Sequence, residues 1–354
     1  MIDDPRPNRK DGERVYYVRR ALLFVALVFL VLLTGCTNVD VETADSGWIT
    51  VYTALPEEQA DSYLAAFNRQ YPKIRINLVR DTASALTDRL FAQAESPEAD
   101  VIWGVPTTNL LLAEWHEILE PYAPAGLERV FIPFRDRANP PHWVGINVGM
   151  SAFCVNRSQM RRLGLPTPQS WQDLLDPIYE GQIVMADPND SRNSFSSVSG
   201  ILQIYGHTKG WEYLDQLDSN IGQYTDSSSQ SCQLAAAGDY PIGISFGIVA
   251  EEVSTQSLGL VFPSEGSGWK MEGNALVHKK QIKPAAKTFL DWAISDKAMD
   301  QYAQNWVITA VETDQPIPSA FPSEPAEQLI DNNLPWVAAN RDSILSEWAD
   351  RYGS

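Results

Sequence analysis

Along residues 48–103, the spacing of apolar and polar residues changes repeatedly between a pattern typical of strands and one typical of helices. Three runs are rich in β-branched and aromatic residues and read as strands: Trp48–Tyr52, Ile74–Val79 and Asp100–Trp103. Between them, 56–71 and 84–94 place apolar residues at helical spacing. Strands that alternate with helices of this length predict βαβ units and a parallel sheet.

The same alternation continues after an unusually long strand-like run, Trp143–Asn156. With 354 residues and 44% apolar side chains, the chain is long enough for two lobes. Further strands are expected at 183–186, 240–248 and 258–262, and further helices at 195–205, 284–295, 297–306 and 329–352.

The first 36 residues carry the pattern of an export leader. Arg19 and Arg20 precede the apolar run Ala21–Leu33, and Thr34-Gly35-Cys36 follows. The ending resembles a bacterial lipobox, in which the cysteine is lipidated and becomes the mature N-terminus. A transmembrane anchor is the alternative, but this run is shorter than the roughly 20 apolar residues that a bilayer requires. We therefore expect a signal peptide over 1–35 and lipidation of Cys36.

This leader predicts a membrane-anchored lipoprotein outside the cytoplasm. Residues 36–47 are mostly small and polar, and they would form the tether between the lipid and the folded part. Residues 1–35 carry six basic and four acidic side chains, so the net charge changes from −18 to −20 when they are removed. A surface this acidic repels polyanions, which excludes nucleic acid as a partner.

The other two cysteines, Cys154 and Cys232, form an even pair. In an oxidising compartment such a pair favours a disulfide. The alternative is two buried free thiols, which behave as small apolar side chains.

Small polar residues follow three of the expected strands. They lie at Tyr52-Thr53, at 103–109 and at 187–194, each directly before an expected helix. Ligands of open α/β sheets bind outside the carboxyl ends of the strands, where the N–H groups of the following helix point outward. Ordinary helix capping uses the same residue types and is the alternative explanation.

A second motif, Gly243–Gly247, matches the nucleophile elbow of hydrolases, with Ser245 as the nucleophile and His278 downstream as the base. The alternative is a strand whose glycines allow close backbone approach. No His, Cys and carboxylate cluster has zinc spacing. A ferric-iron site would need clustered tyrosines, and the adjacent pair, Tyr16-Tyr17, lies in the leader. We therefore expect no metal site, no cofactor and no enzymatic activity.

Several longer segments together resemble a known family over nearly the whole mature chain. They are Val51–Leu55, Ala99–Gly104, Asn139–Gly145, Tyr179–Met185, Gln223–Thr225 and Ala235–Phe246. The combination resembles the extracellular solute-binding proteins of ABC importers, in the ferric-iron-type branch. Within that branch it is most similar to 2-aminoethylphosphonate-binding proteins.

The resemblance implies the type II periplasmic binding protein fold, in which two α/β lobes with mostly parallel sheets enclose a cleft and two crossover strands join them. Lobe 1 would comprise 48–148 and 259–354, and lobe 2 would comprise 149–258. The hinges would lie near 147–153 and 258–262. The protein would act as a monomer that closes over a small solute and delivers it to a permease in the inner membrane.

The candidate ligand residues come from the strand ends and the resemblance. Where the branch carries a Ser-Ser-Gly-Thr-Gly-like run, this chain has Asp190–Ser194, without glycine and with an arginine. A phosphonate could still bind there, since an arginine offers a bidentate fork. Ferric iron, another small anion or zwitterion, and a lipoprotein that senses a ligand or binds a protein partner remain alternatives. The residues are Thr53, Trp103, Thr108, Ser191, Arg192, Asn193, Tyr224 and Ser245.

Overall fold

The computed structural model describes residues 44–248 and 257–353. The expected leader, Cys36 and most of the expected tether lie outside these residues. Within the described ranges, no helix is long and apolar enough to cross a membrane.

The strands join into one mixed sheet with the order β2-β1-β3-β10-β5-β8-β6-β7. Strands β4 and β9 pair at its margins with β10 and β5, and β11 pairs with β5. The bounds are β1 (Gly47–Thr53), β2 (Ile74–Arg80), β3 (Val101–Pro106), β4 (Leu119–Glu120), β5 (Trp143–Asn156), β6 (Ile183–Ala186), β7 (Ile221–Thr225), β8 (Ile242–Phe246), β9 (Leu258–Val261), β10 (Trp269–Val277) and β11 (Ile308–Thr309).

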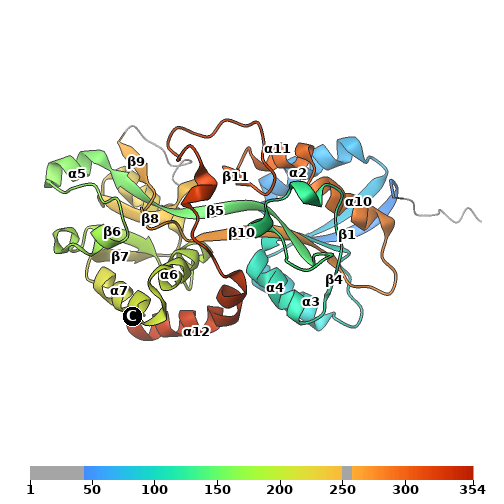
Figure 1. Cartoon of the computed structure of the whole chain (residues 1–354), viewed down its shortest axis with the longest axis horizontal. Coiled ribbons are helices and arrows are strands. Elements are labelled where there is room, and N and C mark those ends of the chain that lie inside the picture. The colour runs from blue at the N-terminus through green and yellow to red at the C-terminus, as the bar shows by residue number, and fades with distance from the viewer. Residues whose placement is uncertain (1–43, 249–256, 354) are drawn as a thin grey trace, which may run out of the picture. The chain divides into compact units, whose positions relative to one another are not determined.

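The long strand β5 belongs to both halves of this sheet. Its first part, Trp143–Met150, pairs antiparallel with β10, and its second part, Ser151–Val155, pairs antiparallel with β8. All 14 residues are buried. Figure 1 shows β5 and β10 running side by side through the centre of the fold. The predicted strand at 143–156 is confirmed, and it is the first crossover between two lobes.

Lobe 1 is built on the parallel strands β1, β2 and β3, with β10 antiparallel beside β3. Its helices are α2 (Glu57–Gln70), α3 (Ala83–Ala92), α4 (Thr107–Trp115), α10 (Pro284–Ala293) and α11 (Asp296–Tyr302). An aromatic cluster fills the core between α2, β3 and the two late helices. Trp103 lies at its centre with 0% of its surface exposed, and its Nε1 donates a 3.0 Å hydrogen bond to Tyr302 Oη.

Lobe 2 is built on β6, which pairs in parallel with β7 and β8. Its helices are α5 (Arg157–Leu163), α6 (Arg192–Tyr205), α7 (His207–Asp218) and α8 (Ser228–Ala237). Phe153 of β5 and Trp171 meet edge to face in the core. A disulfide joins Cys154 of β5 to Cys232 of α8, with the Cα atoms 5.5 Å apart, as the even pair of cysteines predicted.

The last helix, α12 (Leu334–Tyr352), packs on both lobes. Its residues Val337, Ile344, Leu345 and Trp348 join the lobe 2 core, whereas Leu334 and Ala338 join the lobe 1 core. Strand β9 pairs with the lobe 2 part of β5. The expected lobe boundary between residues 258 and 259 falls within β9, and α12, which was expected in lobe 1, contributes to both cores. The division into lobes at that boundary stays a prediction.

The chain returns to lobe 1 through the link between β9 and β10. Ser151 donates from its N and from its Oγ to the Gly268 carbonyl, at 2.8 and 2.9 Å. Helix α6 lies directly against this link, since a Cβ on Gly200 would come within 2.7 Å of Gly268 Cα. The second crossing therefore follows β9, at residues 262–268, rather than lying within the expected 258–262.

The substitution Trp103→Phe tests whether the Trp103 side chain is part of the lobe 1 core. Trp103→Phe removes the hydrogen bond to Tyr302 and leaves a void, so urea denaturation should show a loss of about 2 to 3 kcal/mol in the free energy of unfolding. The control is Trp115→Phe at a side chain that is 48% exposed, where the change should stay within about 0.5 kcal/mol. Unchanged stability with weakened solute binding in Trp103→Phe would instead make Trp103 a ligand residue.

Candidate functional site

A pocket lies where α4 of lobe 1, α6 of lobe 2, β10 and α12 meet. We call it the interlobe pocket; its volume is about 40 Å³. Lobe 1 contributes 106–109 at the start of α4, and lobe 2 contributes Arg192, Phe195 and Ser196 at the start of α6. Residues 269–271 of β10 and three residues of α12 complete the lining. The pocket is thus built from both lobes and from one strand that connects them.

Three cationic residues line the interlobe pocket: Arg192 of α6, Lys270 of β10 and Arg341 of α12. The lining contains no carboxylate and no tyrosine. Among the described residues, no carboxylate forms an ion pair with Arg192 or Lys270. Positive charge therefore gathers in this pocket, although the chain as a whole carries a net charge of −18. Two carboxylates lie near these cations: Asp342 is 3.5 Å from Arg341, and Glu272 is close enough to Lys270 to act on its charge.

Aromatic rings hold two of these cations in place. The Arg341 guanidinium carbon lies 5.6 Å from the centre of the Phe195 ring, and Lys270 Nζ lies 5.7 Å from that of Trp306. Burial lowers the pKa of Lys270, the charge of nearby Glu272 opposes this shift, and the charge of Arg192 adds to it. A bound anion would relieve the repulsion between these cationic side chains.

Both helices that reach the interlobe pocket begin there. Ser191 caps α6, and its Oγ accepts a 3.3 Å hydrogen bond from the Ser194 N–H. Thr107 opens α4, and its Oγ1 donates to the Met271 carbonyl at 3.1 Å, which fixes this helix start against β10. The first turn of a helix carries N–H groups without intrahelical partners and a partial positive charge. The two helix starts add to the positive potential that the three cations create.

A second polar group lies at the strand ends of lobe 2. We call Ser191, Ser228 and Ser245 the serine cluster. Ser191 Oγ and Ser228 Oγ are 2.8 Å apart, and Ser245 Oγ donates to the Ser228 carbonyl at 2.8 Å. All three are buried. They follow β6 and β7 or lie within β8, so the cluster ties the ends of three neighbouring strands together.

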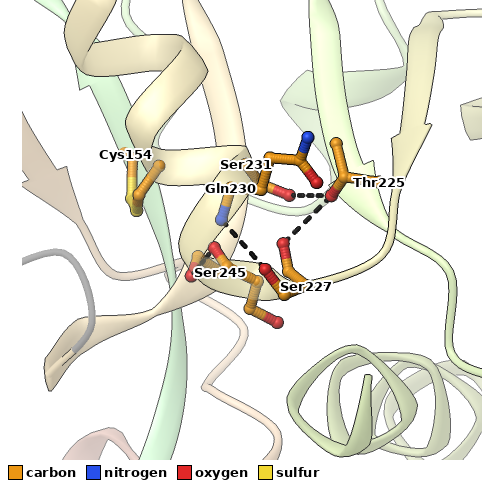
Figure 2. The surroundings of a disulfide bond; sticks show 8 residues. Cys154, Thr225, Ser227, Gln230, Ser231 and Ser245 are labelled. Carbon is orange, nitrogen blue, oxygen red and sulfur yellow. Dashed lines mark hydrogen bonds between the residues drawn. A yellow bond between two sulfur atoms is a disulfide. The ribbon is translucent and has the colours of Figure 1, made fainter. Parts of the chain in front are cut away.

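Figure 2 shows the turn that leads into α8, where Thr225 and Ser227 face Ser231 and Gln230. Thr225 Oγ1 lies 3.0 Å from Ser231 Oγ and donates to the Ser227 carbonyl, while Ser227 caps α8. Ser228 was not predicted from the sequence. It begins α8 shortly after β7, just as Arg192 begins α6 after β6. The hydroxyls of the serine cluster form hydrogen bonds within lobe 2, so these serines hold neighbouring strand ends together.

Two of the predicted ligand residues meet at the interlobe pocket. Thr108 comes from lobe 1 and Arg192 from lobe 2, and both line it. Ser191 and Ser245 are brought together in the serine cluster instead. Asn193 lies next to Arg192 in the first turn of α6, where its carbonyl accepts a hydrogen bond from Ser197 Oγ.

Three other predicted residues point elsewhere. Thr53 is fully buried, and its Oγ1 accepts from the Leu55 N–H in the turn after β1. Trp103 lies in the lobe 1 core, hydrogen-bonded to Tyr302. Tyr224 Oη donates to Asp218 at 2.7 Å, and its ring packs edge-on against Trp348. Burial, and then the hydrogen bond to Asp218, raises the pKa of Tyr224, which therefore stays a neutral packing residue.

Sequence reasoning missed Lys270 and Arg341. One lies on the strand that returns to lobe 1, and the other lies on the Trp-rich last helix. No local motif marks either residue, because tertiary packing decides which side chains of a crossing strand and a terminal helix reach the pocket.

The hydrolase alternative fails on geometry. Ser245 is 2% exposed, lies in lobe 2 and donates its hydroxyl hydrogen to a backbone carbonyl. His278 follows β10 in lobe 1, and its Nδ1 lies 2.6 Å from Glu120 Oε2. A nucleophile needs its base within hydrogen-bonding reach, and these two residues lie in different lobes.

Comparisons with known proteins agree on the scaffold and differ in the solute. Iron uptake protein A1 of Synechocystis sp. is 22% identical over 311 residues, which span 81% of this chain and 85% of that protein. The thiamine-binding periplasmic protein of Brucella melitensis is 23% identical over 273 residues, which span 75% and 78%.

Among solved structures, the periplasmic binding protein AfuA of Actinobacillus pleuropneumoniae with bound fructose-6-phosphate superposes with a TM-score of 0.72. Its sequence identity is 24%, over 86% of this chain and 99% of that one. This likeness confirms the expected periplasmic binding protein fold. Residues 99–340 match the family described as bacterial extracellular solute-binding protein. The chain therefore belongs to the bacterial extracellular solute-binding proteins, the periplasmic solute receptors of ABC importers.

Proposed function

We propose that this protein captures a small anion bearing a phosphoryl or phosphonate group in the interlobe pocket and delivers it to an inner-membrane permease. The observation that carries the proposal is the convergence of Arg192, Lys270 and Arg341 on one pocket whose lining holds no carboxylate. In an otherwise acidic chain, such a concentration of positive charge needs a ligand of opposite sign.

The chemistry of the lining favours a phosphorus oxyanion over ferric iron. Arginine forks bind such oxyanions bidentately, and hydrogen bonds between ionised groups are the stronger kind. Two unit charges 4 Å apart attract each other by about 4 kcal/mol at an effective dielectric constant of 20. Hard cations require oxygen ligands, and neither a carboxylate nor a tyrosine lines the pocket. Among such anions, 2-aminoethylphosphonate is the compound that the sequence resemblance favours.

Capture would proceed by closure of the two lobes. A ligand that contacts both Thr108 of lobe 1 and Arg192 of lobe 2 stabilises the closed arrangement of the lobes. The chain passes between the lobes through β5 and through 262–268, and these two segments would act as the hinge. The segment between β11 and α12 reaches lobe 2 once more, so it would have to follow the motion. Release to the permease requires the reverse motion.

A thermal-shift screen of the purified full-length protein, kept soluble in mild detergent, tests the proposal. The panel is 2-aminoethylphosphonate, phosphonoacetate, fructose 6-phosphate, thiamine and ferric citrate. A ligand at 100 times its dissociation constant stabilises the fold by about 2.7 kcal/mol, which gives a visible shift. We expect the phosphorus compounds to respond. A response to thiamine or ferric citrate alone would contradict the proposal.

Removing one pocket cation should weaken binding of the responding compound. Arg192→Gln and Arg341→Gln each lose a charged hydrogen-bond donor worth about 1.5 to 3 kcal/mol, so the dissociation constant should rise roughly 10- to 100-fold. Isothermal titration calorimetry measures it. Arg162→Gln is the matched control, because Arg162 is exposed on α5 and hydrogen-bonds Gln159. Equal affinity in all three variants would place the ligand elsewhere.

We also propose that Cys36 carries a lipid that holds the protein at the membrane. Cys36→Ser should abolish incorporation of a labelled fatty acid and move the protein from the membrane fraction to the soluble one. The double variant Cys154→Ser/Cys232→Ser is the control, because it removes the other two thiols and should keep the label. Labelling of the Cys36→Ser variant would exclude this anchor.

A further inference from the structure

One half-buried group of metal-ligating side chains lies in lobe 1, outside the interlobe pocket. It consists of Glu114 in the last turn of α4, Asp136 in the loop before β5, and His142 directly before that strand. Their ligand atoms all lie within 4.8 Å of one another. Side-chain exposures of 22%, 12% and 27% leave the group within reach of solvent.

The distances fit a small tetrahedral ion. His142 Nδ1 is 2.9 Å from Asp136 Oδ2 and 3.4 Å from Glu114 Oε1. Zinc binds nitrogen and oxygen ligands at about 2.0–2.2 Å, and tetrahedral geometry then separates neighbouring ligand atoms by roughly 3.3–3.6 Å. The His142–Glu114 separation lies in this range, and the His142–Asp136 separation is about 0.4 Å shorter than its lower limit. The Glu114 and Asp136 oxygens lie within 4.8 Å of each other, so side-chain shifts would complete the coordination.

Groups outside the trio fix the orientation of both carboxylates. Trp143 Nε1 donates to Glu114 Oε2 at 3.2 Å, which turns the other oxygen, Oε1, toward His142. The Ala138 N–H donates to Asp136 Oδ1 at 3.2 Å, and the His142 backbone N–H donates to Oδ2 at 2.9 Å, which holds Oδ2 on the histidine side. Such outer partners orient ligating residues in metal sites.

The charge of the group is not balanced by basic residues. Two carboxylates face one imidazole, and within the part of the chain that the structure describes no lysine or arginine forms an ion pair with Glu114 or Asp136. A divalent cation would neutralise both carboxylates at once.

We propose that Glu114, Asp136 and His142 bind one divalent transition-metal ion of the zinc class, with the fourth position open to water. An imidazole nitrogen with two carboxylate oxygens suits zinc and cobalt, whereas magnesium and calcium prefer six or more oxygens. The site is separate from the proposed solute pocket, although α4 reaches both: its first turn lines the pocket and its last turn carries Glu114. A bound ion would tie α4 to the loop before β5.

The test is calorimetric titration of ZnCl₂ into the purified full-length protein after chelator treatment. We expect one zinc per chain and no heat from MgCl₂. Glu114→Gln, Asp136→Asn and His142→Gln should each weaken binding at least tenfold, and metal-free melting curves will show that each variant folds. The matched control is His278→Gln, which breaks a histidine–carboxylate pair lacking a third ligand and should leave zinc binding unchanged. Absence of stoichiometric binding, or equal binding in all variants, would overturn the proposal.

Discussion

The structure depends on one strand that two lobes share. Every residue of β5 is buried, and its two ends pair with different neighbours, β10 in lobe 1 and β8 in lobe 2. A continuous hydrogen-bonded ladder therefore runs through the junction. Because the parallel strands of each lobe end near this junction, their following helices begin there, and α4 and α6 bring their first turns to one pocket.

The junction also restricts how far the lobes can move. Gly268 lies under α6, and both the N–H and the hydroxyl of Ser151 bond its carbonyl. Because this close backbone contact leaves little room for sliding, we propose that the lobes move by rotation. The last helix contributes to both cores and would have to follow one lobe during opening.

Family membership accounts for the scaffold but leaves the solute open. Relatives at 22–24% identity are named for iron or thiamine, or hold fructose-6-phosphate. The same two-lobed frame thus serves cations and anions, and the side chains at the pocket decide between them. In this chain we propose that three basic residues from three separate elements favour an anion.

Much of the fold could be predicted from the sequence because local patterns encode it. The strand at 143–156 is one uninterrupted apolar run, and the cysteine pair needed only an even count and an oxidising compartment. Thr108 and Arg192 were found because they open helices after strands. Trp103 was selected because the expected strand ended there, but β3 continues to Pro106 and the side chain of Trp103 is buried in the core.

The remaining features depend on contacts between distant segments. Arg341 lies 149 positions after Arg192, and only the packing of α12 across both lobes brings it to the pocket. The trio of Glu114, Asp136 and His142 has no recognisable spacing, since a helix end, a loop and a strand start each supply one member. The packing of α12 on both cores has the same origin, because sequence order carries no signal for it.

The most direct test of the central claim is a crystal structure with the phosphonate or phosphoryl compound that gives the largest thermal shift. This account predicts that the phosphorus oxygens lie within hydrogen-bonding distance of Arg192 and Arg341, between the first turns of α4 and α6. A ligand held at the serine cluster or at another surface, with both arginines free of it, would contradict the account.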